Sequence, residues 1–136
     1  MKRSLVREYA FMFLYQLEIQ NVNIQMQKEY FLAEYSIPDK QIEFFEKRIK
    51  GVYQNKDVLD KILEPYLVKW TLARLPRIDL SILRLALYEI QNEPDIPNNV
   101  AISEAVRLAK KYSGEESRSY INAILGNINR NLEKET

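Results

Sequence analysis

Positively charged side chains crowd the start of the chain, which reads MKRSLVREY. Arg3 and Arg7 are four residues apart, so both lie on one face if this segment is helical. The positive end of a helix dipole disfavours cations, and a capping box begun by Ser4 would need an acid or Gln where Arg7 stands. A bound phosphate would contact both guanidinium groups and the amide hydrogens of the helix start. Lys2, Arg3 and Arg7 therefore indicate a site for a polyanion, or else a solvated basic segment without a ligand.

Aromatic side chains follow this cluster at Tyr9, Phe11 and Tyr15. A ring exposed beside a phosphate site could stack on a nucleic acid base, which contributes about 1–3 kcal/mol per base. The alternative is that these rings are core residues, because the apolar residues of this segment surround most of a helix.

A second group of basic residues lies near KKYSGEESRSYIN and consists of Arg107, Lys110, Lys111 and Arg118. Such cations could continue a track for single-stranded nucleic acid, with Tyr15 and Asn122 contacting bases. Lys110 and Lys111 also sit at a predicted helix end, where the dipole favours cations with or without a ligand.

The segment ARLPRIDLSILR opens the most hydrophobic predicted helix of the chain. Apolar residues cover that helix except for a narrow polar strip, which we expect to be exposed as a docking surface for another protein: Arg77, Ser81, Arg84, Tyr88 and Gln91. In the alternative, Asp79 only caps the helix, and Arg77 and Arg84 are solvated neighbours.

Several classes of chemistry lack the residues that they need. The chain has no cysteine and no histidine, which excludes thiolate sites and removes the usual general base and metal ligand. Its three glycines are too far apart for a phosphate-cradling loop. We therefore expect no catalytic residue, no metal site and no cofactor. No apolar run is long enough to cross a membrane and no signal pattern opens the chain, so we expect a cytoplasmic protein.

Helical periodicity runs through almost the whole sequence and predicts an all-α fold of about seven helices. We expect one domain, 1–136, with an N-terminal half 1–67 and a C-terminal half 68–136. Trp70, Leu72 and Leu75 would fill the gap between the halves. The helices are predicted at 5–19, 23–35, 38–52, 57–67, 77–92 and 100–112, with a last one from 115.

Three stretches together resemble the NusB family of transcription antitermination factors. They are VREYAFMFLYQ near the start, RIDLSILRLALYEI in the centre, and DIPNNVAISEAVRLAKKYSGEESRSYINAILGNI toward the end. The resemblance spans nearly the full length. It implies two perpendicular three-helix bundles and a non-catalytic role.

In that family, the protein pairs with a small-subunit ribosomal protein called NusE. The pair binds the single-stranded boxA element of ribosomal RNA leaders and joins elongating RNA polymerase with NusA and NusG. Some members self-associate, so the resemblance also allows a homodimer. It implies no membrane partner.

By position, Lys2, Arg3, Arg7 and Tyr15 match the family's RNA-facing amino-terminal helix. Asp79 matches an acid that faces NusE, close to Arg84, and Glu116 matches a junction near the RNA and NusE contacts. Two departures stand out: Ser4 replaces a commonly basic residue, and Glu116 replaces a frequent Asp.

Two other interpretations remain. NusB-like domains also precede the catalytic domain of some ribosomal RNA cytosine methyltransferases, but this chain has no cofactor domain and no cysteine, so it could only be a detached domain of that kind. The other is a helical adaptor that binds proteins and no RNA.

Overall fold

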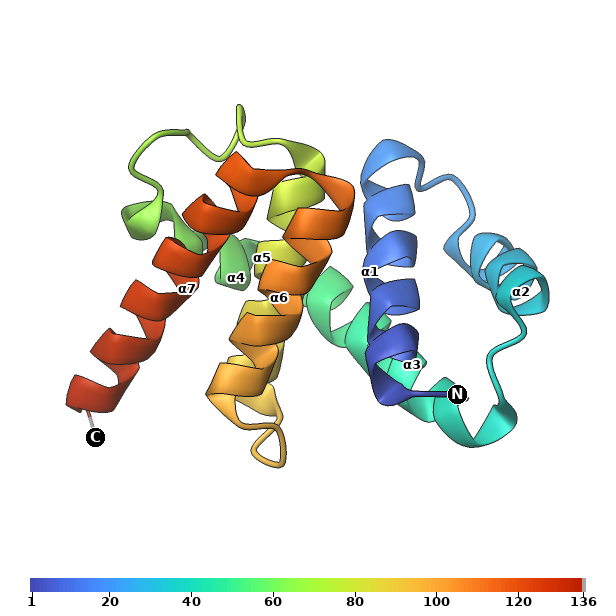
Figure 1. Cartoon of the computed structure of the whole chain (residues 1–136). Helices are drawn as coiled ribbons and strands as arrows, with labels where there is room; N and C mark the ends of the chain where they lie inside the picture. The colour runs from blue at the N-terminus through green and yellow to red at the C-terminus, as the bar shows by residue number, and fades with distance from the viewer. Residues whose placement is uncertain (136) are drawn as a thin grey trace. The chain divides into compact units, whose positions relative to one another are not determined.

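The computed structural model describes residues 1–135, and side chains as far as 133. Within this range the fold is all-α, as predicted, with no β-strand (Figure 1). The elements are α1 (Arg3–Ile19), α2 (Ile24–Tyr35), α3 (Asp39–Gln54), α4 (Lys56–Leu63), the short 3-10 helix η1 (Glu64–Tyr66), α5 (Arg77–Asn92), α6 (Asn98–Tyr112) and α7 (Glu115–Glu135).

The helices form two compact units. Unit 1 is Met1–Gln54 and holds α1 to α3, and unit 2 begins at Asn55 and holds the remaining elements. The helix α4, which the sequence groups with the first half, packs against α5 in unit 2.

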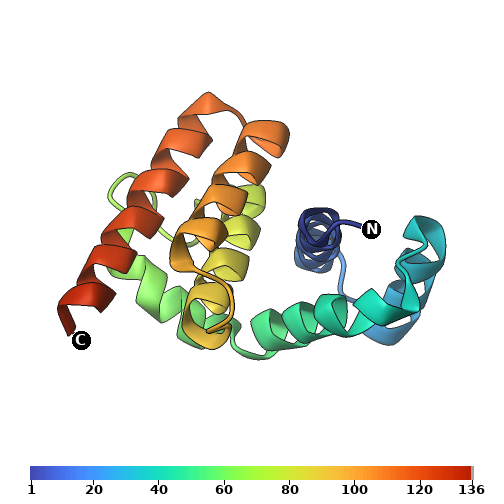
Figure 2. The ribbon, with the colours of Figure 1, turned by 60° about the horizontal axis from the view of Figure 1, so that its bottom comes forward.

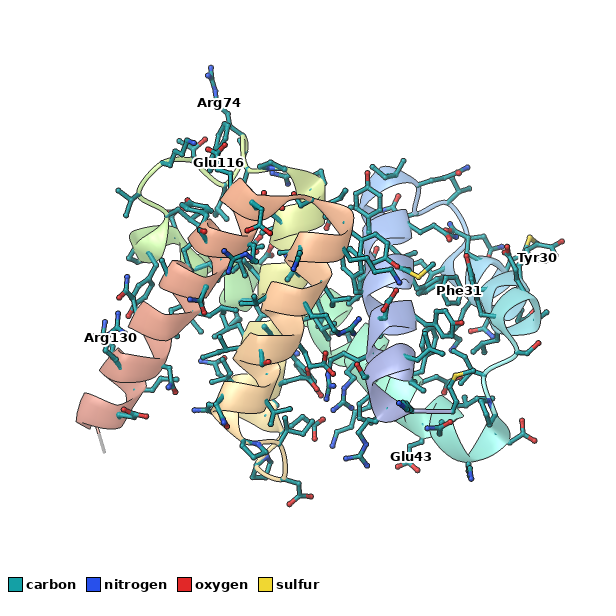
Figure 3. All side chains as sticks on the ribbon, in the orientation of Figure 1. Tyr30, Phe31, Glu43, Arg74, Glu116 and Arg130 are labelled. Atoms are coloured by element: carbon teal, nitrogen blue, oxygen red, sulfur yellow. The ribbon has the colours of Figure 1, made fainter. Side chains whose placement is uncertain are left out.

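Aromatic rings fill the centre of unit 1. Phe31 is the buried residue of α2, and its ring lies 5.2 Å from that of Phe13 and 5.6 Å from that of Phe45, between centroids. The side chain of Phe31 points toward α1, whereas its neighbour Tyr30 points away into solvent (Figure 3). The rings therefore join α2 to both α1 and α3.

In unit 2, α5 is the central helix. Residues 79–89 are all buried, and α6 and α7 pack beside α5 as a helical hairpin (Figure 2). Gly114 ends this hairpin's turn with a φ of 135°, in the left-handed region that favours glycine, which confirms the predicted helix stop.

Most helix bounds agree with the predicted ones within a few residues, and two differ for clear physical reasons. The helix α1 begins at Arg3, with Lys2 at the N-cap, so Ser4 lies inside the helix and does not cap it. The segment predicted as a helix over 57–67, with Pro65 as its expected kink or end, is an α-helix only as far as Leu63, and the 3-10 turn η1 follows because the proline ring cannot continue an α-helix.

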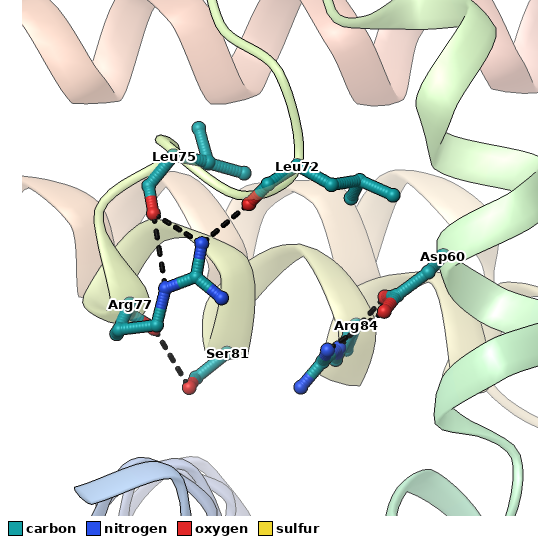
Figure 4. Close-up of polar contacts among 6 residues, drawn as sticks. All are labelled: Asp60, Leu72, Leu75, Arg77, Ser81 and Arg84. Atoms are coloured by element: carbon teal, nitrogen blue, oxygen red, sulfur yellow. Dashed lines mark hydrogen bonds and ion pairs between the residues drawn. The ribbon is translucent and has the colours of Figure 1, made fainter.

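One ion pair joins α4 to α5. Arg84 donates two hydrogen bonds to the Asp60 carboxylate, from Nε at 2.8 Å and from Nη2 at 2.7 Å (Figure 4). The side chains of Arg84 and Asp60 are 9% and 19% exposed, so water screens this pair poorly.

Replacing Asp60 with Asn should lower the free energy of unfolding by about 3 kcal/mol, because Arg84 would keep its charge in a buried place without that carboxylate. Urea unfolding measures the change. The matched control is Asp57→Asn on the same helix, where the side chain is exposed and the expected change is below about 0.5 kcal/mol. Equal effects of the two variants would contradict the assignment.

Candidate nucleic-acid and partner interface

The amino-terminal end of α1 is rich in positively charged side chains. Its N-cap residue, Lys2, makes no side-chain capping bond, and its first turn holds no acidic residue. The Lys2 and Arg3 side chains are exposed, while Arg7 is only 4% exposed. An anion approaching this end would therefore meet Lys2 and Arg3 directly, and Arg7 would act through its charge from behind them.

Arg3 and Arg7 converge on one aromatic ring of α3. Their guanidinium carbons lie 5.0 Å and 5.6 Å from the centroid of the Phe44 ring. The two arginines therefore lie on the same side of α1, as their spacing predicts.

The three aromatic residues predicted near this cluster have different environments. Phe11 is buried, and Tyr9 packs on the rings of Phe31 and Tyr35, so both belong to the core, which was the alternative interpretation. Tyr15 is partly exposed and keeps a ring accessible to a ligand.

The second basic group lies in unit 2. Lys110 and Lys111 are exposed in the last turn of α6. Arg118 donates a 2.8 Å bond to the Glu115 carboxylate, and Asn122 is exposed one turn further along α7. These four predicted residues therefore share the corner between α6 and α7, in a different unit from the amino-terminal cluster.

The predicted polar strip on α5 is largely buried, so its expected exposure was wrong. Ser81 is 1% exposed, Arg84 7% and Tyr88 6%. Arg77 donates to the backbone carbonyls of Leu72 and Leu75, and Ser81 donates to the Arg77 carbonyl (Figure 4). Arg77 thus holds the loop just before α5, and Arg84 holds the helix α4 through Asp60, a partner 24 residues away that the local pattern could not reveal.

Asp79 does not cap α5. It is 1% exposed, and its two carboxylate oxygens each accept a 2.8 Å bond, one from the Ser113 hydroxyl and one from that of Ser117. The carboxylate therefore connects the start of α5 to the α6–α7 corner.

The Asp79 side chain lines a pocket of about 360 Å³ within unit 2. Besides Asp79, its lining includes Lys69, Trp70, Glu116 and Tyr120. Trp70 stands 36% exposed at this pocket, whereas it was expected, with Leu72 and Leu75, to fill the gap between the halves. The hydroxyl of Tyr120 is buried here with no hydrogen-bond partner in the structure.

The sequence interpretation missed Lys69 and Tyr120 as members of this site. The only local signal was the adjacent pair Lys69–Trp70 in a loop, since a large aromatic residue next to a cation is common at binding surfaces.

An exposed ion pair closes one side of the pocket. The Lys69 ammonium donates a hydrogen bond to the Glu116 carboxylate. Glu116 lies at the start of α7 (Figure 3). This bond, with the Coulomb attraction of the same ammonium, holds the pKa of Glu116 below its ordinary value of 4.5.

The described part of the chain offers neither a metal-binding cluster nor a helix that could span a membrane. No group of three or more carboxylates could hold a metal ion. No helix there is long and apolar enough to cross a membrane.

Comparison with known proteins agrees with this helical arrangement. A model of the NusB family matches residues 4–130. The chain belongs to the NusB family. A transcription antitermination protein NusB from Acetivibrio thermocellus is 44% identical over 128 residues, which cover 94% of this chain and 88% of that protein.

Solved NusB structures have the same fold. A NusB structure from T. maritima is 36% identical, with a TM-score of 0.86 over 94% of this chain and 90% of that one. A complex of the antitermination factors NusB and NusE with double-stranded RNA contains a chain that is 22% identical, with a TM-score of 0.79 over 94% of this chain and 97% of that one.

Because Lys69 lowers the pKa of Glu116, the variant Lys69→Met should raise the midpoint of the Glu116 titration toward 4.5. A depressed pKa in the folded state stabilises the fold above the unfolded-state pKa, and this small contribution is lost as the pH falls through the folded-state pKa. NMR titration of the Glu116 carboxyl carbon measures the midpoint. An identical midpoint in both proteins would exclude the ion pair in solution.

Proposed function

We propose that this NusB-family chain binds single-stranded boxA RNA of ribosomal RNA leaders together with NusE. The complex would then act on elongating RNA polymerase with NusA and NusG, as a non-catalytic antitermination factor. The observation that carries the RNA part is the exposed pair Lys2 and Arg3 at a helix start that has no side-chain capping bond from its N-cap residue and no acid in its first turn.

The amino-terminal cluster supplies the first set of phosphate contacts in this proposal. Lys2 and Arg3 are accessible to phosphate oxygens, and the buried Arg7 adds to the positive field. Tyr15 is partly exposed on the same helix and offers its ring to a base.

The α6–α7 corner supplies the second set. Lys110 and Lys111 would contact phosphates, while Arg118 exchanges its bond to Glu115 for a phosphate and the Asn122 amide contacts a base. If about three to five phosphates are neutralised, the logarithm of the affinity falls with that of the salt concentration at a slope of about −2 to −3.5.

NusE would bind at the pocket beside Glu116. This carboxylate is exposed and can exchange Lys69 for a basic side chain of the partner. Asp79, Arg77 and Arg84 would act indirectly, because their bonds hold the α6–α7 corner, the loop before α5 and the helix α4. A solved assembly of NusB and NusE with RNA supports joint binding in the family. Coupling between the two ligands would be about 1–3 kcal/mol.

Two alternatives to this proposal are a detached methyltransferase domain and a homodimer that covers the RNA-binding surfaces. A detached methyltransferase domain is disfavoured, because the match extends over 88% of a NusB protein named for antitermination alone. A homodimer that covers the basic surfaces would compete with RNA, and sedimentation at increasing RNA concentration would detect such competition.

The double variant Lys2→Glu/Arg3→Glu should weaken boxA binding at least tenfold and make the salt slope shallower by about 1.4, which corresponds to two lost phosphate contacts. Fluorescence anisotropy with a labelled boxA oligonucleotide, with and without NusE, measures both quantities. Arg7→Glu is a poorer test because Arg7 is buried.

The matched control is Lys61→Glu/Arg130→Glu, which changes the net charge by the same amount at two exposed residues outside both clusters. If both double variants weaken RNA binding equally, attraction is only through total charge and the amino-terminal site is wrong. If the wild-type chain binds no RNA even with NusE, the adaptor interpretation replaces this one.

Glu116→Lys should weaken NusE binding about tenfold or more through repulsion of a basic partner, and leave binding of RNA alone within about threefold. Titration calorimetry with purified NusE measures the first affinity. The control is Glu64→Lys, an equal charge change at an exposed residue of η1. Unaltered NusE affinity in Glu116→Lys would place the partner elsewhere.

A further inference from the structure

One face of α3 runs beneath the basic start of the chain. Gln41, Phe44 and Arg48 are spaced by three and four residues, so they share a helix face. The Gln41 amide donates a 2.6 Å hydrogen bond to the backbone carbonyl of Met1. The residue before the N-cap of α1 is therefore anchored to α3.

Phe44 lies at the middle of this face, and three arginine side chains lie close to its ring. The guanidinium carbon of Arg48 is 3.3 Å from the ring centroid, that of Arg3 is 5.0 Å away and that of Arg7 5.6 Å. All three are within the roughly 6 Å at which the negative face of an aromatic ring attracts a cation. Arg48 also donates from Nη1 to the Phe44 carbonyl at 3.3 Å.

The neighbouring ring, Phe45, belongs to the hydrophobic core. Phe45 is 0% exposed and stacks on Phe31 in the core of unit 1, whereas Phe44 is only partly buried. Two adjacent phenylalanines on a helix point about 100° apart, so one can serve the core while the other faces the arginines. Phe44 is thus separable from the hydrophobic core in a mutational test.

We infer that Phe44 is a positioning residue for RNA binding: its ring holds the exposed Arg3 in the orientation that a phosphate backbone requires, with the buried Arg7 behind it. This inference rests on the proposed function. A long arginine side chain loses rotamer freedom when it binds, and a ring that already orders it reduces that loss. The ring itself contacts no phosphate, so its removal weakens binding without changing the number of ion contacts.

The test therefore has two readouts, which are the affinity for boxA RNA and the dependence of that affinity on salt concentration. Phe44→Leu keeps an apolar side chain but removes the ring, and it should weaken boxA binding about three- to tenfold with an unchanged salt slope. Phe44→Tyr and Phe44→Trp keep a ring and should bind within about twofold of the wild type. Arg3→Gln should weaken binding and also make the slope shallower by about 0.7, the value for one phosphate.

Combining Phe44→Leu with Arg3→Gln should weaken binding by less than the product of the two single effects, because the ring acts partly through Arg3. If the two effects multiply fully, or if Phe44→Leu binds like the wild type, the positioning role is wrong. Should Phe44→Leu unfold, a ring-fluorinated phenylalanine at position 44 preserves the shape and depletes the ring face of electrons. Wild-type affinity in that protein would equally overturn the inference.

Failure of the proposed function would look different. If neither Arg3→Gln nor Lys2→Glu/Arg3→Glu affects boxA binding, the amino-terminal surface is not the RNA site, whatever Phe44→Leu does. If both weaken binding and Phe44→Leu does not, the amino-terminal surface remains the RNA site and only the positioning role of Phe44 is excluded.

Discussion

The burial of α5 is the constraint on which unit 2 depends. Every residue from Asp79 to Glu89 is buried, so each polar side chain in that run needs an internal partner. Arg84 finds it in Asp60 of α4, and Asp79 finds it in hydroxyls of the α6–α7 corner. These bonds therefore tie α5 to the elements before and after it, and they shape the floor of the pocket beside Glu116.

In unit 1, three arginines pack against an aromatic ring. Its rings of Phe13, Phe31 and Phe45 form an apolar centre, and its arginines gather at the edge of that centre around Phe44. Cations stacked on a ring retain their charge while part of their hydration is replaced. A helix start that looks unfavourable by its own electrostatics is in this way ordered by the neighbouring helix.

The all-α class and most helix positions could be predicted, because apolar spacing and breakers such as Pro65 and Gly114 act locally. The environment of the polar side chains could not be predicted from the sequence. Arg84 looked like an exposed arginine because its partner Asp60 is 24 positions away, and Asp79 looked like a cap because Ser113 and Ser117 are 34 and 38 positions away. The same holds for Arg7 and Phe44, which periodicity places on helices without showing that they meet. The basic composition of the candidate site was visible in the sequence, but its aromatic support was not.

The backbone conformation at Gly114 limits which amino acids can occupy this position. A Cβ at this position would meet no atom within 4 Å, yet the φ of 135° is strained for any L-amino acid. The energetic cost of a substitution at this position comes from the positive φ of the backbone and not from the size of the side chain. Alanine should therefore destabilise the turn almost as much as leucine. A D-amino acid, whose preferred backbone angles are mirrored, would fit the same corner and leave Ser113 and Ser117 in reach of Asp79.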